Sequence, residues 1–257
     1  MTTMGPPTIP SGTHWPGQYV ELVKLNLLIL RSATWFILMV QAAFIVGFVF
    51  GFGYLIPNIE EQTALYLTTG AATQAIVTVG LVFLPQFLAE AKDQGRLDYF
   101  FTLPISREVY LLAQLTVVVV LAAPGITMAL VTGAWRYDLT LDLDPALAVV
   151  VPLAVFSLAG FGVAVAMISP HLQITNAFTQ LIIFYVIFFA PVMIPESQLP
   201  TLLQYTADVL PPGYAADAMR ATVTDLPGTD LTQSLGAMAI FSAISITVAA
   251  AVVRRRR

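Results

Sequence analysis

The residue types that usually carry enzyme chemistry are scarce in this chain. It has no cysteine, and its only histidines are His14 and His171, so thiolate sites, paired haem ligands and the His-Glu-x-x-His zinc motif are absent. Neither of its two lysines, Lys24 and Lys92, follows a glycine, so there is no Gly-Lys-Ser/Thr phosphate loop. No Gly-x-Ser-x-Gly motif occurs. We therefore expect no catalytic residue, no metal site and no cofactor in this chain.

The composition is that of an integral membrane protein. Hydrophobic residues make up 58% of the chain and charged residues 10%, whereas soluble domains have about 25% charged residues. The mean hydropathy is +0.82. Long stretches without Asp, Glu, Lys, Arg or His have the length that a helix needs to cross the bilayer, and lipid cannot satisfy an open backbone. An all-α membrane protein is predicted, with six spans at Thr34–Ile56, Ala64–Leu88, Val109–Ala134, Ala146–Ser169, Leu172–Ile194 and Gly236–Val253.

The basic residues predict how the spans are oriented. Only Arg136 and Arg220 of the eleven lie outside three groups, which precede the first span, separate the second from the third and follow the sixth. Basic residues gather on the cytoplasmic side of membrane proteins, so both termini are predicted to be cytoplasmic in a multi-pass protein of the cell membrane. The four C-terminal arginines are interpreted as a stop-transfer and lipid-headgroup anchor, and no nucleic-acid binding is expected. The basic residues of the three groups are Lys24, Arg31, Lys92, Arg96, Arg107, Arg254, Arg255, Arg256 and Arg257.

The chain is predicted to have three parts. Residues 1–18 are polar and rich in Gly and Pro, lack the features of a signal peptide, and are expected to form a disordered cytoplasmic tail. Residues 19–253 form the six-span domain, and 254–257 are the basic C-terminus. Within the domain, Tyr19–Arg31 is amphipathic at helical spacing. It is either a helix that lies on the cytoplasmic leaflet or an extension of the first span.

A cytoplasmic loop between spans two and three has features of a docking surface. Gly95 can break a helix, and Pro104 can end the next one. A short helix between them would place three apolar residues on one face, with charged residues around them. An apolar knob with a charged rim is typical of protein docking, but the same side chains could instead rest on the membrane surface. The three residues are Leu97, Phe100 and Phe101.

The predicted external segment Pro191–Pro227 contains six prolines. The stretches between them are too short for two further spans, but the segment could enter the outer leaflet as a helical hairpin and return. A short helix is expected over Tyr214–Thr222. It would place Asp217 and Arg220 on one face.

Two parts of the chain resemble signatures of a known family. They are Glu90…Gly95-Arg-Leu…Thr102-Leu-Pro-Ile-Ser-Arg107 and Pro191…Pro195…Leu199-Pro…Pro211-Pro-Gly-Tyr…Asp217-Ala-Met-Arg220. In this order, and with the predicted spans, they resemble the membrane subunits of ABC-2 type ABC transporters. The resemblance covers Tyr19–Val253. Asp98 and Tyr99 differ from many members, and the acidic loop Asp138–Asp144 looks particular to this chain.

The resemblance implies a permease subunit that moves a hydrophobic or amphipathic substrate outward, such as a drug, lipid or glycolipid. It also implies a connecting helix at Tyr19–Arg31, a coupling helix in the Glu90–Arg107 loop, and a re-entrant hairpin at Pro191–Pro227. The implied partners are ABC ATPase subunits, which bind ATP and Mg, a second identical or related permease subunit, and membrane lipid. The alternatives are a lipid or glycan flippase of the same family, and a membrane enzyme or assembly factor without transport activity. The resemblance assigns ATPase coupling to Glu90, Gly95, Leu97, Phe100, Phe101, Pro104, Arg107 and His171.

Inside the spans, Gly47 and Gly51 form a Gly-x-x-x-Gly motif, which allows close helix approach either within the chain or between subunits. Aromatic and amide residues in the spans could line a substrate path. They could equally face lipid, pack in the core or form interhelical hydrogen bonds. The path candidates are Gln74, Gln180, Phe184, Tyr185 and Phe188.

Overall fold

Every regular element in the described part of the chain is a helix, which confirms the all-α prediction. No strand occurs in these residues. The computed structural model describes residues 15–55, 59–102, 107–190, 192–193, 210–224 and 230–255.

In the part of the chain that the structure describes, five helices are long and apolar enough to cross a membrane. The first runs continuously through α1 (Trp15–Ile45), a π-helical turn (Val46–Gly51) and α2 (Phe52–Leu55), and the second through α3 (Glu61–Val77), another π-helical turn (Thr78–Phe83) and α4 (Leu84–Asp93). The others are α6 (Arg107–Tyr137), α7 (Leu147–Ile168) and α11 (Leu231–Arg255).

The remaining described helices are shorter. The predicted span Leu172–Ile194 corresponds to the apolar α8 (Leu172–Phe189). This helix has 18 residues, slightly fewer than the roughly twenty that a transmembrane helix needs. The sixth span therefore stays a prediction. The short helices outside the spans are α5 (Arg96–Thr102) and α10 (Pro211–Val223). The latter contains the helix that was expected over Tyr214–Thr222, and it begins at the first of two prolines, where a missing N–H costs nothing.

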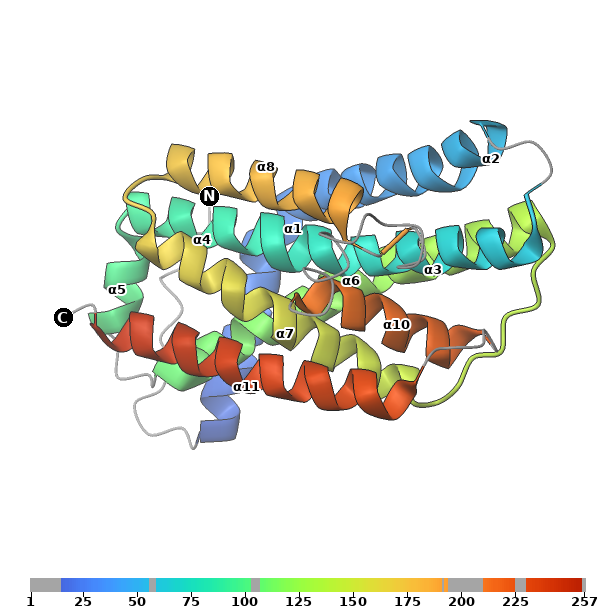
Figure 1. Cartoon of the computed structure of the whole chain (residues 1–257). Helices are drawn as coiled ribbons and strands as arrows, with labels where there is room; N and C mark the ends of the chain where they lie inside the picture. The colour runs from blue at the N-terminus through green and yellow to red at the C-terminus, as the bar shows by residue number, and fades with distance from the viewer. Residues whose placement is uncertain are drawn as a thin grey trace, which may run out of the picture.

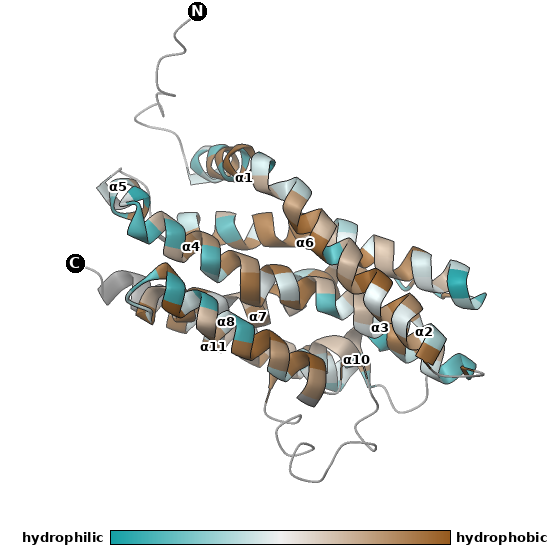
Figure 2. Cartoon of the chain, turned by 90° about the horizontal axis from the view of Figure 1, so that it is seen from above, coloured by the Kyte–Doolittle hydropathy of each residue, from teal (hydrophilic) through white to brown (hydrophobic). Residues whose placement is uncertain are grey.

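The helix formed by α3 and α4 lies at the centre of the bundle. Its most apolar 18-residue window is entirely buried, with α6 and α10 packed on α3, and α7 and α8 packed on α4. The peripheral α1 and α11 pack against α6 and α7, respectively, and only 28% and 22% of their most apolar 18-residue windows are buried. Figure 2 shows hydrophobic residues along most of the bundle and hydrophilic residues at its two ends, including α5. This distribution matches a protein whose middle contacts lipid.

The amphipathic segment Tyr19–Arg31 belongs to the same helix as the first span. Figure 1 shows the N-terminal part of α1 crossing the long axis of the bundle before the helix bends to run along it. The hydroxyl of Thr34 donates to the carbonyl of Leu30 at 2.9 Å, a side-chain bond that often bends helices. The segment is therefore continuous with the first span, as the second alternative predicts, but runs in a different direction from it. The structure also places Trp15–Gln18 in α1 rather than in the tail.

Polar bonds fix this first part of α1 to the start of α6. The hydroxyls of Tyr19 and Thr116 are 2.7 Å apart. The amide nitrogen of Gln114 donates to Asn26 Oδ1 at 3.0 Å, and Asn26 donates to the carbonyl of Leu22. The N-terminal part of α1 is thus held in a defined position at one end of the bundle.

Small residues allow α7 and α11 to approach closely. Ser245 donates to the carbonyl of Ser157 at 2.8 Å, and Ser242 donates to the carbonyl of Leu153 at 3.1 Å. A Cβ atom added to Gly160 would lie 2.6 Å and 2.7 Å from backbone atoms of Ser245. Close approach of this kind drives helix association where there is no hydrophobic effect between the helices.

We predict that Gly160→Ala lowers the free energy of unfolding by about 1–3 kcal/mol, because the added methyl group overpacks the α7–α11 contact. Thermal unfolding of the purified protein would measure the loss. Gly236→Ala on α11 is the matched control, since an added Cβ there meets nothing within 4 Å. Equal stability of the two variants would contradict the prediction.

Candidate functional site

A tight turn separates α4 from α5, as Gly95 predicts. The N–H groups of Gln94 and Gly95 donate to the carbonyls of Glu90 and Lys92, both at 3.0 Å. Gly95 has φ of +70°, in the left-handed region that other residues rarely adopt. The expected short helix follows as α5. Pro104 and the side chains of Phe101 and Arg107 lie outside the described part of the structure.

The face that α5 presents outward differs from the prediction. Leu97 is 0% exposed, and the half-buried ring of Phe100 lies 5.5 Å from the ring of Tyr110. Phe100 lines a small pocket together with residues of α1, α4 and α6, so the knob expected from Leu97 and Phe100 points into the bundle. Among the aromatic side chains of α5 that the structure describes, Tyr99 is exposed, at 66%, with the exposed Asp98 beside it. The sequence spacing of Leu97 and Phe100 predicted that they share one face of the helix. It did not predict that this face packs against the rest of the chain.

The turn between α7 and α8 lies next to the α4–α5 turn. His171 is exposed and precedes α8, and its side chain makes no capping hydrogen bond. The N–H of Leu172 instead donates to a carboxylate oxygen of Asp93 at 2.9 Å. The structure therefore brings together two chain segments, Glu90–Gly95 and the turn at His171, that the family resemblance assigns to ATPase coupling.

The five predicted path residues do not lie on one surface. Gln74 is 1% exposed inside the bundle, and neither polar atom of its amide has a hydrogen-bond partner. Gln180, Phe184 and Phe188 are exposed on α8, with Tyr185 half-buried beside them. The rings of Phe184 and Phe188 are 4.7 Å apart. A path along α8 would therefore not include Gln74.

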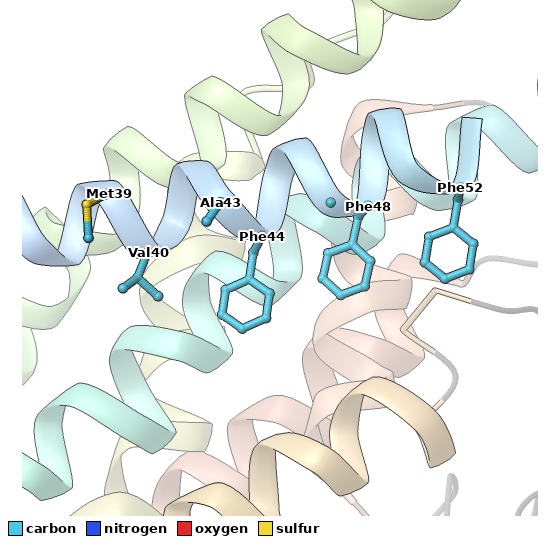
Figure 3. A pocket seen from close by; sticks show the side chains of 7 residues that line it. Met39, Val40, Ala43, Phe44, Phe48 and Phe52 are labelled. Carbon is cyan, nitrogen blue, oxygen red and sulfur yellow. The ribbon is translucent and has the colours of Figure 1, made fainter. Parts of the chain in front are cut away.

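An apolar groove of about 590 Å³ runs along α1 and α2. The rings of Phe44, Phe48 and Phe52 point the same way from the helix and stack at 5.9 Å spacing (Figure 3). A Cβ atom added to Gly47 or Gly51 would meet nothing within 4 Å. Packing of this Gly-x-x-x-Gly motif within the described chain is thus excluded, and the motif faces open space. The groove is lined by Met39, Val40, Ala43, Phe44, Gly47, Phe48 and Phe52.

At the opposite end of the bundle from α5, a buried arginine fixes α10. Arg220 is 1% exposed, donates to Asp217 at 2.7 Å and to the carbonyl of Val192, and stacks over the ring of Tyr66 at 4.2 Å. The pairing of Asp217 with Arg220 confirms the prediction that they share a face. The contact with Tyr66 on α3 was not predicted, since nothing in the local pattern links residues so far apart.

The acidic loop Asp138–Asp144 holds the C-terminal end of α10. The backbone N–H groups of Asp142 and Asp144 donate to the carbonyls of Val223 and Thr222 at 3.1 Å and 2.9 Å. These carbonyls are at the end of the helix and have no partner within it. The loop and Arg220 together attach α10 to α3, to the start of α7 and to Val192.

Comparison with known proteins identifies the family. The family model described as ABC-2 type transporter matches residues 18–224, and the chain belongs to this family. Nodulation protein J of Rhizobium leguminosarum bv. trifolii is 29% identical over 135 residues, which are 52% of this chain and 51% of that protein. The similarity to this relative thus spans about half of its length. The chain is a multi-pass membrane protein of an ABC transporter permease family.

We predict that Arg220→Leu lowers the free energy of unfolding by about 2 kcal/mol or more, because it removes charged hydrogen bonds from a buried site. Asp217→Asn should cost less, since the Asp217 side chain is 43% exposed. The loss of unfolding free energy in Arg220→Lys should lie between the losses in these two variants. A lysine keeps the charge, but its ammonium lacks the planar guanidinium that hydrogen-bonds two groups at once. Thermal unfolding ranks the three variants. A larger loss for Asp217→Asn than for Arg220→Leu would overturn this account.

Proposed function

We propose that this chain is the transmembrane subunit of an ATP-driven exporter. It would move a hydrophobic or amphipathic substrate, such as a drug, lipid or glycolipid, outward across the cell membrane. ATP and Mg would bind a separate ATPase subunit, and this chain would be non-catalytic. The observation that carries the proposal is the exposed face of α5, which stands at the end of a bundle whose apolar spans have no ionisable residue.

The energy source follows from the charge distribution. Transporters that use ion gradients usually keep ionisable groups near the middle of the membrane, and the predicted spans of this chain contain none. The chain also lacks a phosphate loop. Work done by this protein would therefore come from the nucleotide cycle of a partner.

The nature of the cargo is inferred from the exposed apolar surfaces. Phe184 and Phe188 on α8 are exposed and apolar, and apolar and aromatic surfaces suit lipid-like molecules. A lipid or glycan flippase of the same family would use the same surfaces. A membrane enzyme is disfavoured because the sequence has no catalytic motif, and an assembly factor without transport activity is the remaining alternative. Stable co-purification with an ABC ATPase would distinguish a transporter subunit from a membrane enzyme and from an assembly factor.

The proposed orientation puts both termini, α5 and the α7–α8 turn on the cytoplasmic side, with α10 on the external side. The bias of basic residues supports it. A single cysteine at Gln94 should react with a membrane-impermeant maleimide only after the membrane is permeabilised, because Gln94 is exposed at the α4–α5 turn. Labelling of intact cells at this position would reverse the orientation.

We expect Tyr99 to be a main contact with the ATPase, since exposed tyrosines are common binding hot spots. Tyr99→Ala should weaken ATPase binding by about 30-fold, which corresponds to about 2 kcal/mol. The stability of the isolated chain should stay unchanged. Binding of the purified ATPase to the chain in nanodiscs would measure the effect.

Phe100→Ala is the matched control for this experiment. Phe100 is half-buried against Tyr110, so its truncation should lower the thermal stability of the chain. If Tyr99→Ala leaves ATPase binding unchanged while Phe100→Ala weakens it without loss of stability, the outward face has been assigned wrongly. Asp98 and Tyr99 are also the positions that differ from many family members, so they are candidates for selecting the ATPase.

We propose that the open face of α1 receives a second permease subunit, because small residues let helices approach closely in lipid. Gly47→Leu should reduce dimer formation, measured by subunit counting in nanodiscs, without lowering monomer stability. Gly236→Leu is the control, since Gly236 also has no neighbour within 4 Å of an added Cβ. An unchanged dimer fraction for Gly47→Leu would exclude this face from the interface.

A further inference from the structure

The side chain of Lys92, in the last turn of α4, lies against the C-terminal end of α7. Its ammonium donates to the carbonyl of Ala166 at 3.4 Å, to the carbonyl of Met167 at 3.3 Å, and to the carbonyl of Ser169. The last carbonyls of a helix have no partner within it and carry partial negative charge. Lys92 therefore stabilises the end of α7 both as a donor and as a cation.

The next residue, Asp93, acts on the start of α8. Its Oδ2 atom accepts the backbone N–H of Leu172, the first residue of that helix, at 2.9 Å. The first N–H groups of a helix lack internal partners and carry partial positive charge. An N-terminal cap usually comes from the residue that precedes the helix. Here His171 occupies that position without capping, and the carboxylate comes from α4.

We propose that Lys92 and Asp93 form a clamp that transmits displacement of α5 to α7 and α8. The proposal rests on the proposed function, in which α5 meets the ATPase. Two residues of opposite charge, adjacent in the sequence, complement the two helix ends that meet at one turn. A shift of α4 relative to this turn would break contacts with at least one of the two ends.

The position of the clamp suits it to transmission. α5 begins three residues after Asp93, and the tight turn at Gln94 and Gly95 allows little slack between them. On the other side of the clamp, α8 carries the exposed aromatic residues, and α7 packs against α4, α10 and α11. The clamp thus links the proposed ATPase-facing helix to the exposed apolar surface on α8 and, through α7, to the external helix α10.

Spin labels across the clamp test its rigidity without any partner. The chain has no native cysteine, and Gln94 and His171 are both exposed, so a cysteine pair at these positions can be labelled selectively. The distance distribution should be single and narrow in nanodiscs. Lys92→Met combined with Asp93→Asn should broaden it, and Asp93→Asn alone, a nearly isosteric change, should give an intermediate width.

Two controls define the outcomes of this measurement. Lys92→Arg keeps a cationic donor and should retain the narrow distribution. Lys24→Met combined with Glu21→Gln removes an exposed ion pair of 3.1 Å on α1 and should also leave it narrow. A distribution that stays narrow in the Lys92–Asp93 double variant, or broadens equally in the Lys24–Glu21 control, would overturn the clamp.

Transmission is tested in the complex with the partner ATPase. A single label at Leu181, which is 67% exposed on α8, reports the distance between two copies of the chain. ATP should shift this distance in the wild-type complex. The clamp variant should lose most of that shift while still hydrolysing ATP. A full shift in the clamp variant would overturn transmission, whereas no shift in the wild type would contradict the proposed function and leave the clamp to be judged by the first measurement.

Discussion

The exclusion of charge from the hydrocarbon region is the constraint on which this structure depends. A charged side chain in the middle of a bilayer is costly, and every backbone polar group there must be satisfied within the protein. Continuous helices meet the second demand. The ionisable residues therefore gather at the two ends of the bundle, where unpaired carbonyl and N–H groups can use them. In the middle, close packing of small residues holds α7 against α11.

The two ends of the bundle use charge in different ways. At the proposed cytoplasmic end, Lys92 and Asp93 complement the ends of α7 and α8 and join two turns that are far apart in the sequence. At the other end, Arg220 is buried and bonds a carboxylate, a carbonyl and an aromatic ring, which fixes α10 on α3. Between them, α8 and the open face of α1 present apolar surface. A subunit that transmits motion from a partner to an apolar path needs such fixed ends and such a surface.

The sequence predicted features that depend on local chemistry. Long uncharged stretches located the five long helices, Gly95 located the break before α5, and the paired prolines marked the start of α10. Features that depend on neighbours distant in the sequence were missed or predicted wrongly. The spacing of Leu97 and Phe100 showed that they share a face but not that this face is covered by α1 and α6. The contacts of Lys92 with α7 and of Tyr66 with Arg220 likewise depend on tertiary packing.

The central claim is that this chain changes conformation only when a separate ATPase subunit binds and hydrolyses ATP. The direct measurement is the reaction rate of a single cysteine at Phe188, exposed on α8, with a membrane-impermeant maleimide in proteoliposomes. The account predicts that ATP changes this rate only when the ATPase is present, and that ionophores leave the change intact. A change driven by an imposed pH gradient in the chain alone would contradict it.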